Sequence, residues 1–279
     1  MSECESVGEG GVGEVRAPAG VDPYTPSVAR MYDYYLGGKD NFASDREAAE
    51  KIIEILPNLR DIARENREFL IRAVTYLSRQ GIRQFLDIGA GLPTQRNVHQ
   101  VAQELVPESR VVYVDNDPIV MSHARALLAE NDRVIAVDAD MRDPEALLAR
   151  PEIRAHLDFT RPVAILLLGV LHFVPDDEEA ARIVATLKTA LGPGGHLVIS
   201  HGSIGELSDE QQSAGERVFS RTAVPGTRSR SPEQVRAFFD GLEPVEPGVV
   251  PLQDWRPDTD VPLARPGEAG AVGGVARMA

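Results

Sequence analysis

From residue 82 onward, short apolar runs alternate with stretches of helical periodicity. The apolar runs predict strands at 84–88, 110–115, 133–137, 163–170 and 196–201. The stretches between them predict helices at about 94–106, 118–130, 144–157 and 176–191. Alternating strands and helices are typical of βαβ units, so we expect an α/β fold with a parallel sheet. Two further strands, at about 245–251 and 269–277, would close the sheet with a hairpin-like pair.

The segment before this pattern predicts helices only. The first begins at Thr25-Pro26 and ends at Gly37-Gly38. The second begins with the capping box Ser44–Glu47 and ends at Pro57, and the third covers about 58–79. We therefore expect a disordered tail at 1–22, an N-terminal helical cap at 23–80, and a main domain at 81–279 with a polar lid insertion at 206–230.

Composition narrows the class of protein. A hydrophobic content of 43% is sufficient for a large core, and the net charge of −14 argues against a nucleic-acid or anionic-membrane surface. Cys4 is the only cysteine, so neither a disulfide framework nor a zinc set is expected. The longest apolar run, 163–174, is too short to span a bilayer, and the start lacks the features of a signal peptide. We expect a cytoplasmic protein.

Three aspartates follow successive predicted strands: Asp87, Asp115 and Asp140. In a parallel sheet the carboxyl ends of the strands form the ligand-binding edge. An aspartate after a strand is also a common helix N-cap, but three at successive strand ends favour a ligand site. Gly89 and Gly91 follow the first of them and let a ligand approach the backbone.

Two kinds of ligand are candidates for this site. A dinucleotide fingerprint would need a third glycine at position 94, which is Thr94, and Asp87 would repel a pyrophosphate. A sulfonium-bearing amino acid suits an acidic strand end better. Asp115 could accept hydrogen bonds from ribose hydroxyls in either case. Asp140 could accept from an adenine amino group, with Met141 packed on the ring.

These residues, together with two later motifs, resemble class I S-adenosylmethionine-dependent methyltransferases. The later motifs are Gly169-Val170-Leu171-His172-Phe173 and Leu191-Gly192-Pro193-Gly194-Gly195. The segments 32–42 and 85–98 further resemble an actinobacterial family of predicted S-adenosyl methyltransferases, formerly a domain of unknown function. Pro93 departs from the general pattern, in which many members carry a glycine.

The resemblance implies a Rossmann-like, seven-stranded, mostly parallel sheet with an antiparallel last strand and a helical cap over S-adenosyl-L-methionine. It also implies roles for particular residues. Asp87, Gly89, Ala90 and Gly91 are expected near the aminoacyl part of the cofactor, and Asp115 and Asn116 near the ribose. Asp140 and Met141 are expected near the adenine, and Gly169 near the sulfonium.

The motif at 32–42 has two interpretations. Tyr32 and Tyr35 share the apolar face of the first helix, so they either pack in the core or contact substrate. The loop after them is either a plain turn between helices or a lid in which Lys39, Asp40 or Asn41 contacts cofactor or substrate.

A catalytic base is needed only when the acceptor must lose a proton. His172, after the fourth strand, is the first candidate, with a structural histidine as the alternative; His201 is the second. Three arginines at 221, 228 and 230 could bind an acidic substrate or lie solvated on a lid. The sequence thus favours a methyltransferase acting on a small molecule. A non-catalytic S-adenosylmethionine-binding regulatory module and an NAD(P) oxidoreductase are the alternatives.

Overall fold

The computed structural model describes residues 21–93, 96–128, 131–203, 208–222, 224, 226–257 and 270–279. The predicted tail therefore lies almost entirely outside the described residues, as does Thr94. Within these ranges no helix is both long enough and apolar enough to cross a membrane.

The centre of the molecule is one sheet with strand order β3-β2-β1-β4-β5-β8-β6, in which β7 also pairs with β8. Strands β1 to β5 run parallel, and β8 is antiparallel to β5. The predicted α/β class and the antiparallel last strand are confirmed. The strands are β1 Gln84–Ile88, β2 Arg110–Asp115, β3 Val134–Asp138, β4 Ala164–Leu168, β5 His196–Gly202, β6 Glu243–Pro244, β7 Val250–Pro251 and β8 Ala271–Arg277.

The sheet has eight strands, where seven were expected, because the predicted strand at 245–251 is interrupted. Pro247 has no N–H to donate to a neighbouring strand. Gly248 has a φ of +85° and donates its N–H to the carbonyl of Val245, which makes a turn. Two short strands, β6 and β7, therefore pair with β8 on either side of this turn.

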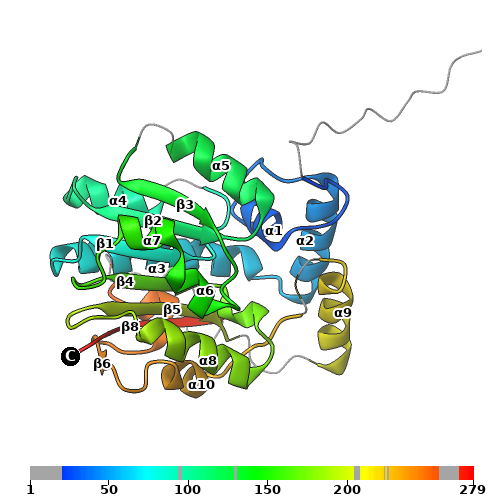
Figure 1. The fold of residues 1–279 in the computed structure, drawn as a ribbon. Helices are drawn as coiled ribbons and strands as arrows, with labels where there is room; N and C mark the ends of the chain where they lie inside the picture. Colours follow the sequence, from blue (N-terminus) through cyan, green and yellow to red (C-terminus); the bar gives the residue numbers. More distant parts are fainter. Residues whose placement is uncertain are drawn as a thin grey trace, which may run out of the picture.

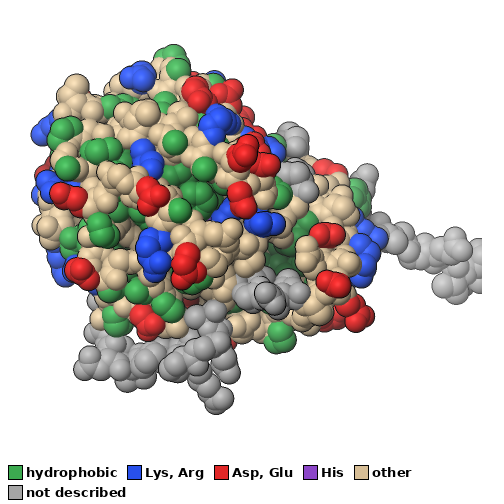
Figure 2. Space-filling model, turned by 90° about the horizontal axis from the view of Figure 1, so that it is seen from below, with side chains coloured by type: hydrophobic (Ala, Val, Ile, Leu, Met, Phe, Trp, Pro, Cys, Tyr) green, Lys and Arg blue, Asp and Glu red, His purple; other side chains and the backbone are tan. Residues whose placement is uncertain are grey.

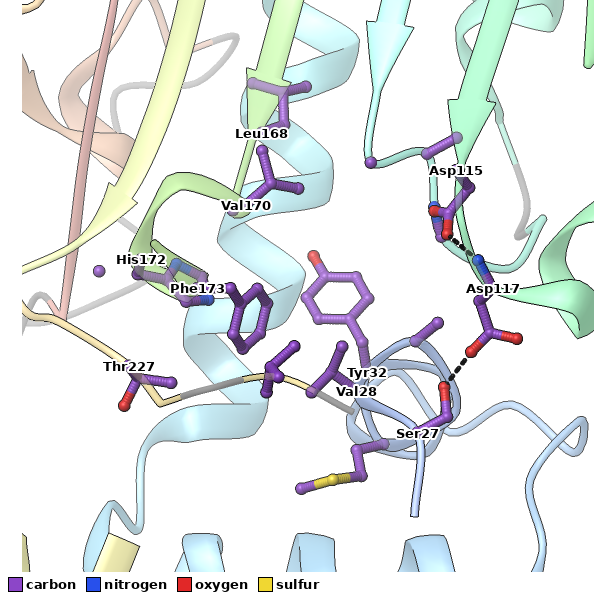
Figure 3. A pocket seen from close by; sticks show the side chains of 18 of the residues that line it. Ser27, Val28, Tyr32, Asp115, Asp117, Leu168, Val170, His172, Phe173 and Thr227 are labelled. Atoms are coloured by element: carbon purple, nitrogen blue, oxygen red, sulfur yellow. Dashed lines mark hydrogen bonds between the residues drawn. The ribbon is translucent and has the colours of Figure 1, made fainter. Parts of the chain in front are cut away.

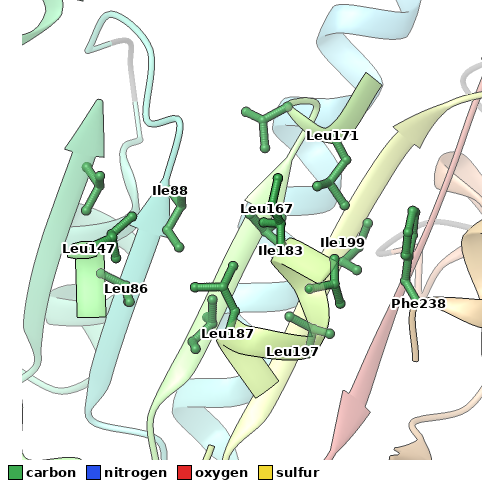
Figure 4. Packing of buried hydrophobic residues seen from close by; sticks show 14 of the residues in the cluster. Leu86, Ile88, Leu147, Leu167, Leu171, Ile183, Leu187, Leu197, Ile199 and Phe238 are labelled. Carbon is green, nitrogen blue, oxygen red and sulfur yellow. The ribbon is translucent and has the colours of Figure 1, made fainter. Parts of the chain in front are cut away.

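Helices cover both faces of the sheet (Figure 1). One apolar cluster joins it to α6, α7, α8 and α10, and Figure 4 shows Ile183 and Leu187 of α8 beside Leu167 and Leu197 of the strands. A second cluster joins the other face to α3 and α4. The helices are α1 Val28–Tyr35, α2 Ala43–Ile55, α3 Leu59–Arg79, α4 Val98–Leu105, α5 Pro118–Leu128, α6 Pro144–Ala149, α7 Pro151–His156, η1 Leu171–Phe173, α8 Asp177–Lys188, α9 Asp209–Phe219, α10 Pro232–Ala237 and η2 Leu252–Asp254.

The first two helices begin at other residues than predicted, because of one buried carboxylate. Asp45 accepts hydrogen bonds from the backbone N–H of Phe42 and of Ser27 and from Arg30 Nε. Phe42 and Ser27 are the N-cap residues of α2 and α1. The predicted starts at Thr25-Pro26 and at Ser44 are therefore wrong by about one or two residues. One side chain of α2 thus binds the N-cap N–H of its own helix and that of α1.

Proline positions account for two further boundaries. Pro151 begins α7 and divides the predicted helix 144–157 into α6 and α7, because a proline inside a helix lacks the N–H for the preceding turn. Asp143 caps α6 by accepting from the N–H of Ala146, and Asp117 accepts from the N–H of Ile119 at the start of α5. The predicted starts of these two helices, at 118 and 144, are confirmed.

The helices α1, α2 and α9 lie together at one end of the sheet, although α9 is far from the others in sequence (Figure 1). On the face shown in Figure 2, acidic and basic side chains are mixed with apolar ones. The arrangement of α1, α2 and α9 matters for the site, because they adjoin the carboxyl ends of the parallel strands.

Candidate functional site

A cavity of about 630 Å³ lies at the carboxyl ends of β1, β2 and β4, between these strand ends and the N-terminal helices. Pockets of about 300–1,000 Å³ are typical of sites for small ligands. Figure 3 shows Tyr32 of α1 in the cavity, with Val170, His172 and Phe173 on one side and Asp115 and Asp117 on the other. Every predicted cofactor residue lines the cavity: Asp87, Gly89, Ala90, Gly91, Asp115, Asn116, Asp140, Met141 and Gly169.

Asp87 is the most unusual charge in the cavity. Its residue is 5% exposed, and burial raises the pKa of its carboxyl to about 7. The nearby Arg67 acts to lower this pKa, and the carboxyl of Asp115 acts to raise it. A buried carboxylate is costly without a positive partner. This position therefore suits a ligand that brings a positive charge.

The glycine turn after β1 has the shape that the sequence predicts. Gly89 has a φ of +75°, and a Cβ at this position would lie 2.3 Å from a methyl carbon of Val170. Gly91 has a φ of +65°, with no atom within 4 Å of the place a Cβ would take. The first glycine is thus required by close packing and the second borders open space, where a ligand can approach the backbone.

Asp115 is oriented by its own strand end. One carboxylate oxygen accepts from the N–H of Gly91 at 2.9 Å and the other from the N–H of Asp117 at 2.9 Å. Burial raises its pKa, and hydrogen bonds from these backbone groups act to lower it. Ser27, at the start of α1, donates to Asp117 (Figure 3). The helical cap is therefore tied directly to this strand end.

Asp140 differs from the other two aspartates because it already has a cation. Arg142 donates to it from Nε at 3.0 Å and from Nη2 at 2.6 Å, and Asn116 donates at 3.4 Å. Burial acts to raise the pKa of Asp140, but the hydrogen bonds from Arg142 outweigh it and lower that pKa. The predicted contact of Asp140 with an adenine amino group would have to share its oxygens with Arg142.

The sequence did not predict a chain of hydrogen bonds that lies on the wall of the cavity. Ser200 donates to Oδ1 of Asn66 at 2.6 Å, the amide of Asn66 donates to the Tyr32 hydroxyl at 3.0 Å, and this hydroxyl donates to the carbonyl of Ala63 at 3.1 Å. Burial raises the pKa of Tyr32. Tyr32 and Tyr35 both line the cavity. The signal for Asn66 is its place four residues after Ile62, a polar side chain on the apolar face of α3.

The side chains of Asn66 and His172 both lie close to Gly169. A Cβ on Gly169 would lie 3.2 Å from Nδ2 of Asn66 and 3.9 Å from Cε1 of His172. Gly169 directly follows β4, so this point is at the edge of the sheet, between the acidic strand ends and η1. It is where side chains of the cap and of the sheet meet.

His172 is held in its neutral form. Its Nδ1 is buried and neither accepts nor donates a hydrogen bond within the described part of the chain. Burial lowers its pKa to about 3, and His201 and Arg230 act in the same direction. His201 is neutral too, because its Nδ1 donates to the carbonyl of Gly202 at 2.7 Å and its Nε2 accepts from Arg230 at 3.0 Å. Neither ring readily takes up a proton.

The three arginines that the sequence suggested for an acidic substrate lie in different places. Arg230 is buried, pairs with Asp177 at 2.9 Å and donates to the carbonyls of Leu171 and Val174, so it fixes η1 rather than a substrate. Arg228 lines the cavity and also pairs with Asp177, at 3.2 Å. Arg221 is exposed and is not among the lining residues.

The loop after α1 is organised around Asp33, which is buried. Its carboxylate accepts from the N–H of Asp40 at 3.0 Å and from the amide of Asn41 at 2.8 Å. A Cβ on Gly38 would overlap this carboxylate. Lys39 is exposed, and neither Lys39 nor Asn41 lines the cavity. The structure thus brings the two tyrosines of this motif to the site and leaves the loop residues in a turn.

Within the described residues no group of three His, Cys, Asp or Glu side chains is arranged to hold a metal ion. Asp87, Asp115, Asp117 and Asp140 line the cavity at the strand ends, where Arg142 is paired with Asp140, and the glycine turn leaves space beside them. These features fit a ligand with a positive charge and hydroxyl groups better than a diphosphate.

Comparison with known families decides between these ligands. The S-adenosyl methyltransferase family model matches residues 14–279. The chain belongs to this family. S-Adenosyl-L-methionine is therefore its cofactor and methyl transfer its class of reaction.

Two of the solved structures that resemble this chain cover more than nine-tenths of it. One is a protein from Thermobifida fusca YX described as a candidate methyltransferase, with 41% identity and a TM-score of 0.87 over 95% of this chain and 99% of that one. The other is a DUF574 family protein from Streptomyces avermitilis MA-4680, with 41% identity and a TM-score of 0.84 over 91% of this chain and 98% of that one. No curated protein matches the chain.

Proposed function

We propose that this protein transfers a methyl group from S-adenosyl-L-methionine to a small molecule that enters the cavity beside η1. The observation that carries the proposal is the continuity of the cavity. Its lining includes the acidic strand ends, the wall of Asn66 and His172, and apolar side chains of α1 and α9. A single space that holds both reactants can keep them in the aligned contact that displacement at carbon requires.

In the proposed complex each strand end binds one part of the cofactor. When bound, the cofactor supplies an electrophilic methyl group on a positive sulfur. Asp87 would face the ammonium group beside the turn formed by Gly89, Ala90 and Gly91. Asp115 and Asn116 would accept from or donate to the ribose hydroxyls. Asp140, Met141 and Gly169 would line the adenine and sulfonium ends.

The domain organisation belongs to the same proposal. The helices at 23–80 would act as a cap that excludes water from the reacting groups, and Tyr32 and Tyr35 would contact the acceptor from α1. The segment 206–230 would close the opposite wall, since Phe219, Val224 and Arg228 line the cavity. Lys39 and Asn41 would act only indirectly, through the turn around Asp33.

The net charge of −14 and the mixed charges on the face in Figure 2 support a small acceptor rather than a nucleic acid, whose phosphates need a basic surface. His172 would orient the acceptor by a hydrogen bond and would not act as a strong general base, since it stays neutral. The group that faces the acceptor from η1 would thus be His172.

Calorimetric titration with S-adenosylmethionine and S-adenosylhomocysteine tests the cofactor part of the proposal, with binding expected for both. Mass spectrometry of incubations with a metabolite extract then tests the reaction. Steady formation of S-adenosylhomocysteine together with a product heavier by one methylene is expected. Tight binding without turnover on any extract would instead indicate a regulatory module, and the absence of binding would refute the proposal.

A further inference from the structure

Beyond the strand ends the cavity continues into an apolar compartment. We use this name for the part lined by Met31, Tyr35, Ile52, Leu59, Phe173 and Phe219. All but Phe173 belong to, or pack against, one apolar cluster of α1, α2, α3 and α9. The ring centroids of Phe173 and Phe219 are 6.2 Å apart, so η1 continues this compartment. An acceptor with a ring system would bury its hydrocarbon surface here.

Among the residues that the structure describes, the carboxylates of the cavity are not in this compartment. Those that line the cavity, Asp22, Asp87, Asp115, Asp117 and Asp140, lie before α1 or at the ends of β1, β2 and β3. The described lining residues from α2, α3, η1 and the segment 219–229 include no Asp or Glu. They do include the guanidinium groups of Arg67 and Arg228. An acceptor that carries an ammonium group would therefore find no opposite charge among these described residues.

The polar groups at the mouth of the compartment favour an oxygen nucleophile. Asn66 and His172 flank one point beside Gly169, and the buried Nδ1 of His172 has no partner in the described part of the chain. Arg230 is 2% exposed at its side chain and lies behind His201, and it shares the carboxylate of Asp177 with Arg228, so two guanidinium groups face one carboxylate at this corner. Positive charge nearby favours the ionised form of a hydroxyl group, and it disfavours a protonated amine.

We propose that the methyl acceptor is a ring-bearing, mainly apolar molecule with an acidic hydroxyl of the phenol class, bound with its oxygen between Asn66 and His172. This inference rests on the proposed function. The hydroxyl loses its proton to water before the transfer. The phenolate oxygen forms a bond to the methyl carbon as the bond from that carbon to sulfur breaks, and the bonding pair stays on sulfur. The products are a methyl ether and neutral S-adenosylhomocysteine.

A matched set of two-ring probes tests the proposal. The probes are para-phenylphenol, its more acidic nitro derivative, and para-phenylbenzylamine, which has the same rings and an ammonium group. Calorimetry on the S-adenosylhomocysteine complex measures binding, and mass spectrometry measures methyl transfer from S-adenosylmethionine. Both phenols should bind and be methylated, with kcat/KM at least ten-fold above that for the amine. The pH at which the rate rises should be lower for the nitro derivative.

The outcomes separate this inference from the function on which it rests. If S-adenosylhomocysteine binds but neither phenol does, or if the amine is methylated as fast as the phenols, the assignment of the acceptor is wrong and the cofactor site stands. If S-adenosylhomocysteine does not bind, both proposals are wrong.

A pair of variants tests the charge argument in the protein itself. Phe219 is only partly buried, so its replacement should leave the fold intact. Phe219→Glu and Phe219→Gln have side chains of similar size and differ in charge. The Glu variant should bind para-phenylphenol at least ten-fold more weakly than the Gln variant, with equal affinity for S-adenosylhomocysteine. Equal binding of the phenol by the two variants would overturn the argument.

Discussion

The two halves of the cavity are built in different ways. At the strand ends, carboxylates are fixed by backbone groups of the loops that follow the strands, as the N–H groups of Gly91, after β1, and Asp117, after β2, fix Asp115. In the apolar compartment, side chains from α1, α2, α3 and α9 meet although residues 31 and 219 are far apart in the chain. The first half is suited to one cofactor of fixed chemistry. The second is shaped by packing and can differ in shape without loss of the first.

The largest effect that would test this comparison is expected at Asp87. The substitution Asp87→Asn removes the charge that would face the cofactor ammonium group, and a charged hydrogen bond contributes about 1.5–3 kcal/mol. The affinity for S-adenosylmethionine should fall by about 100-fold in calorimetry. Asp138→Asn is the control, since Asp138 ends β3, is exposed and does not line the cavity. Similar losses in both variants would contradict the assigned role.

The next effect separates two aspartates of the strand ends. Asp115→Ala should weaken S-adenosylmethionine binding by about 10-fold to 100-fold, because a carboxylate that binds two hydroxyls is lost. Asp140→Ala should weaken it by less than about 10-fold, because Arg142 already occupies the oxygens of Asp140. The two dissociation constants, measured by calorimetry, check the order. A larger loss in the Asp140 variant would mean that Arg142 leaves this carboxylate when the cofactor binds.

A change in pH should have a smaller effect on the affinity for S-adenosylmethionine. The pKa of Asp87 is raised to about 7 in the free protein, where Arg67, Asp115 and Tyr113 are the neighbouring titratable groups. A cationic ligand favours the ionised carboxyl, so binding should release a proton and the affinity should rise as pH increases towards about 7. Calorimetry in buffers of different ionisation enthalpy measures this release. The release should be absent in Asp87→Asn, and its persistence there would assign the proton to another group.

The raised pKa of Asp87 also makes the folded protein less stable as pH rises. In the folded protein Asp87 holds its proton up to about pH 7, whereas an unfolded aspartate loses it near about pH 4. Stability should therefore fall as pH rises between these values, and Asp87→Asn should remove this loss. Above pH 7 the variant should unfold with a free energy higher by about 1–3 kcal/mol. Denaturant unfolding of both proteins at several pH values checks the sign. A less stable variant would indicate a partner for Asp87.

The smallest effect concerns the wall between the halves. Tyr32→Phe removes the hydroxyl that joins Asn66 to Ala63, so the free energy of unfolding should fall by about 1 kcal/mol, without change in S-adenosylhomocysteine binding. Tyr34→Phe is the control, because the hydroxyl of Tyr34 contacts Glu50 at the exposed surface. Weaker cofactor binding in Tyr32→Phe would show that this wall also positions the strand-end half.

The strand-end half was predictable because its residues follow a local rule. An aspartate at or just beyond the carboxyl end of a parallel strand faces the edge where the cavity lies, as Asp87, Asp115 and Asp140 do. At the start of α2, Asp45 binds the N–H of Phe42 from within the first turn of the same helix. At the start of α1 the error comes from a long-range contact, since Asp45 also binds the N–H of Ser27. The roles of Arg230 and Asn66 were missed for the same reason, because their partners are distant in sequence.

The sequence by itself determined the α/β class, the acidic strand ends and the family, because periodicity and short motifs are properties of neighbouring residues. Only the tertiary structure decided which helices enclose the second half of the cavity. It also showed that His172 is neutral and that Arg230 is buried. These depend on burial and on charges brought together from distant segments, and no local pattern records the dielectric environment that a folded chain creates around a side chain.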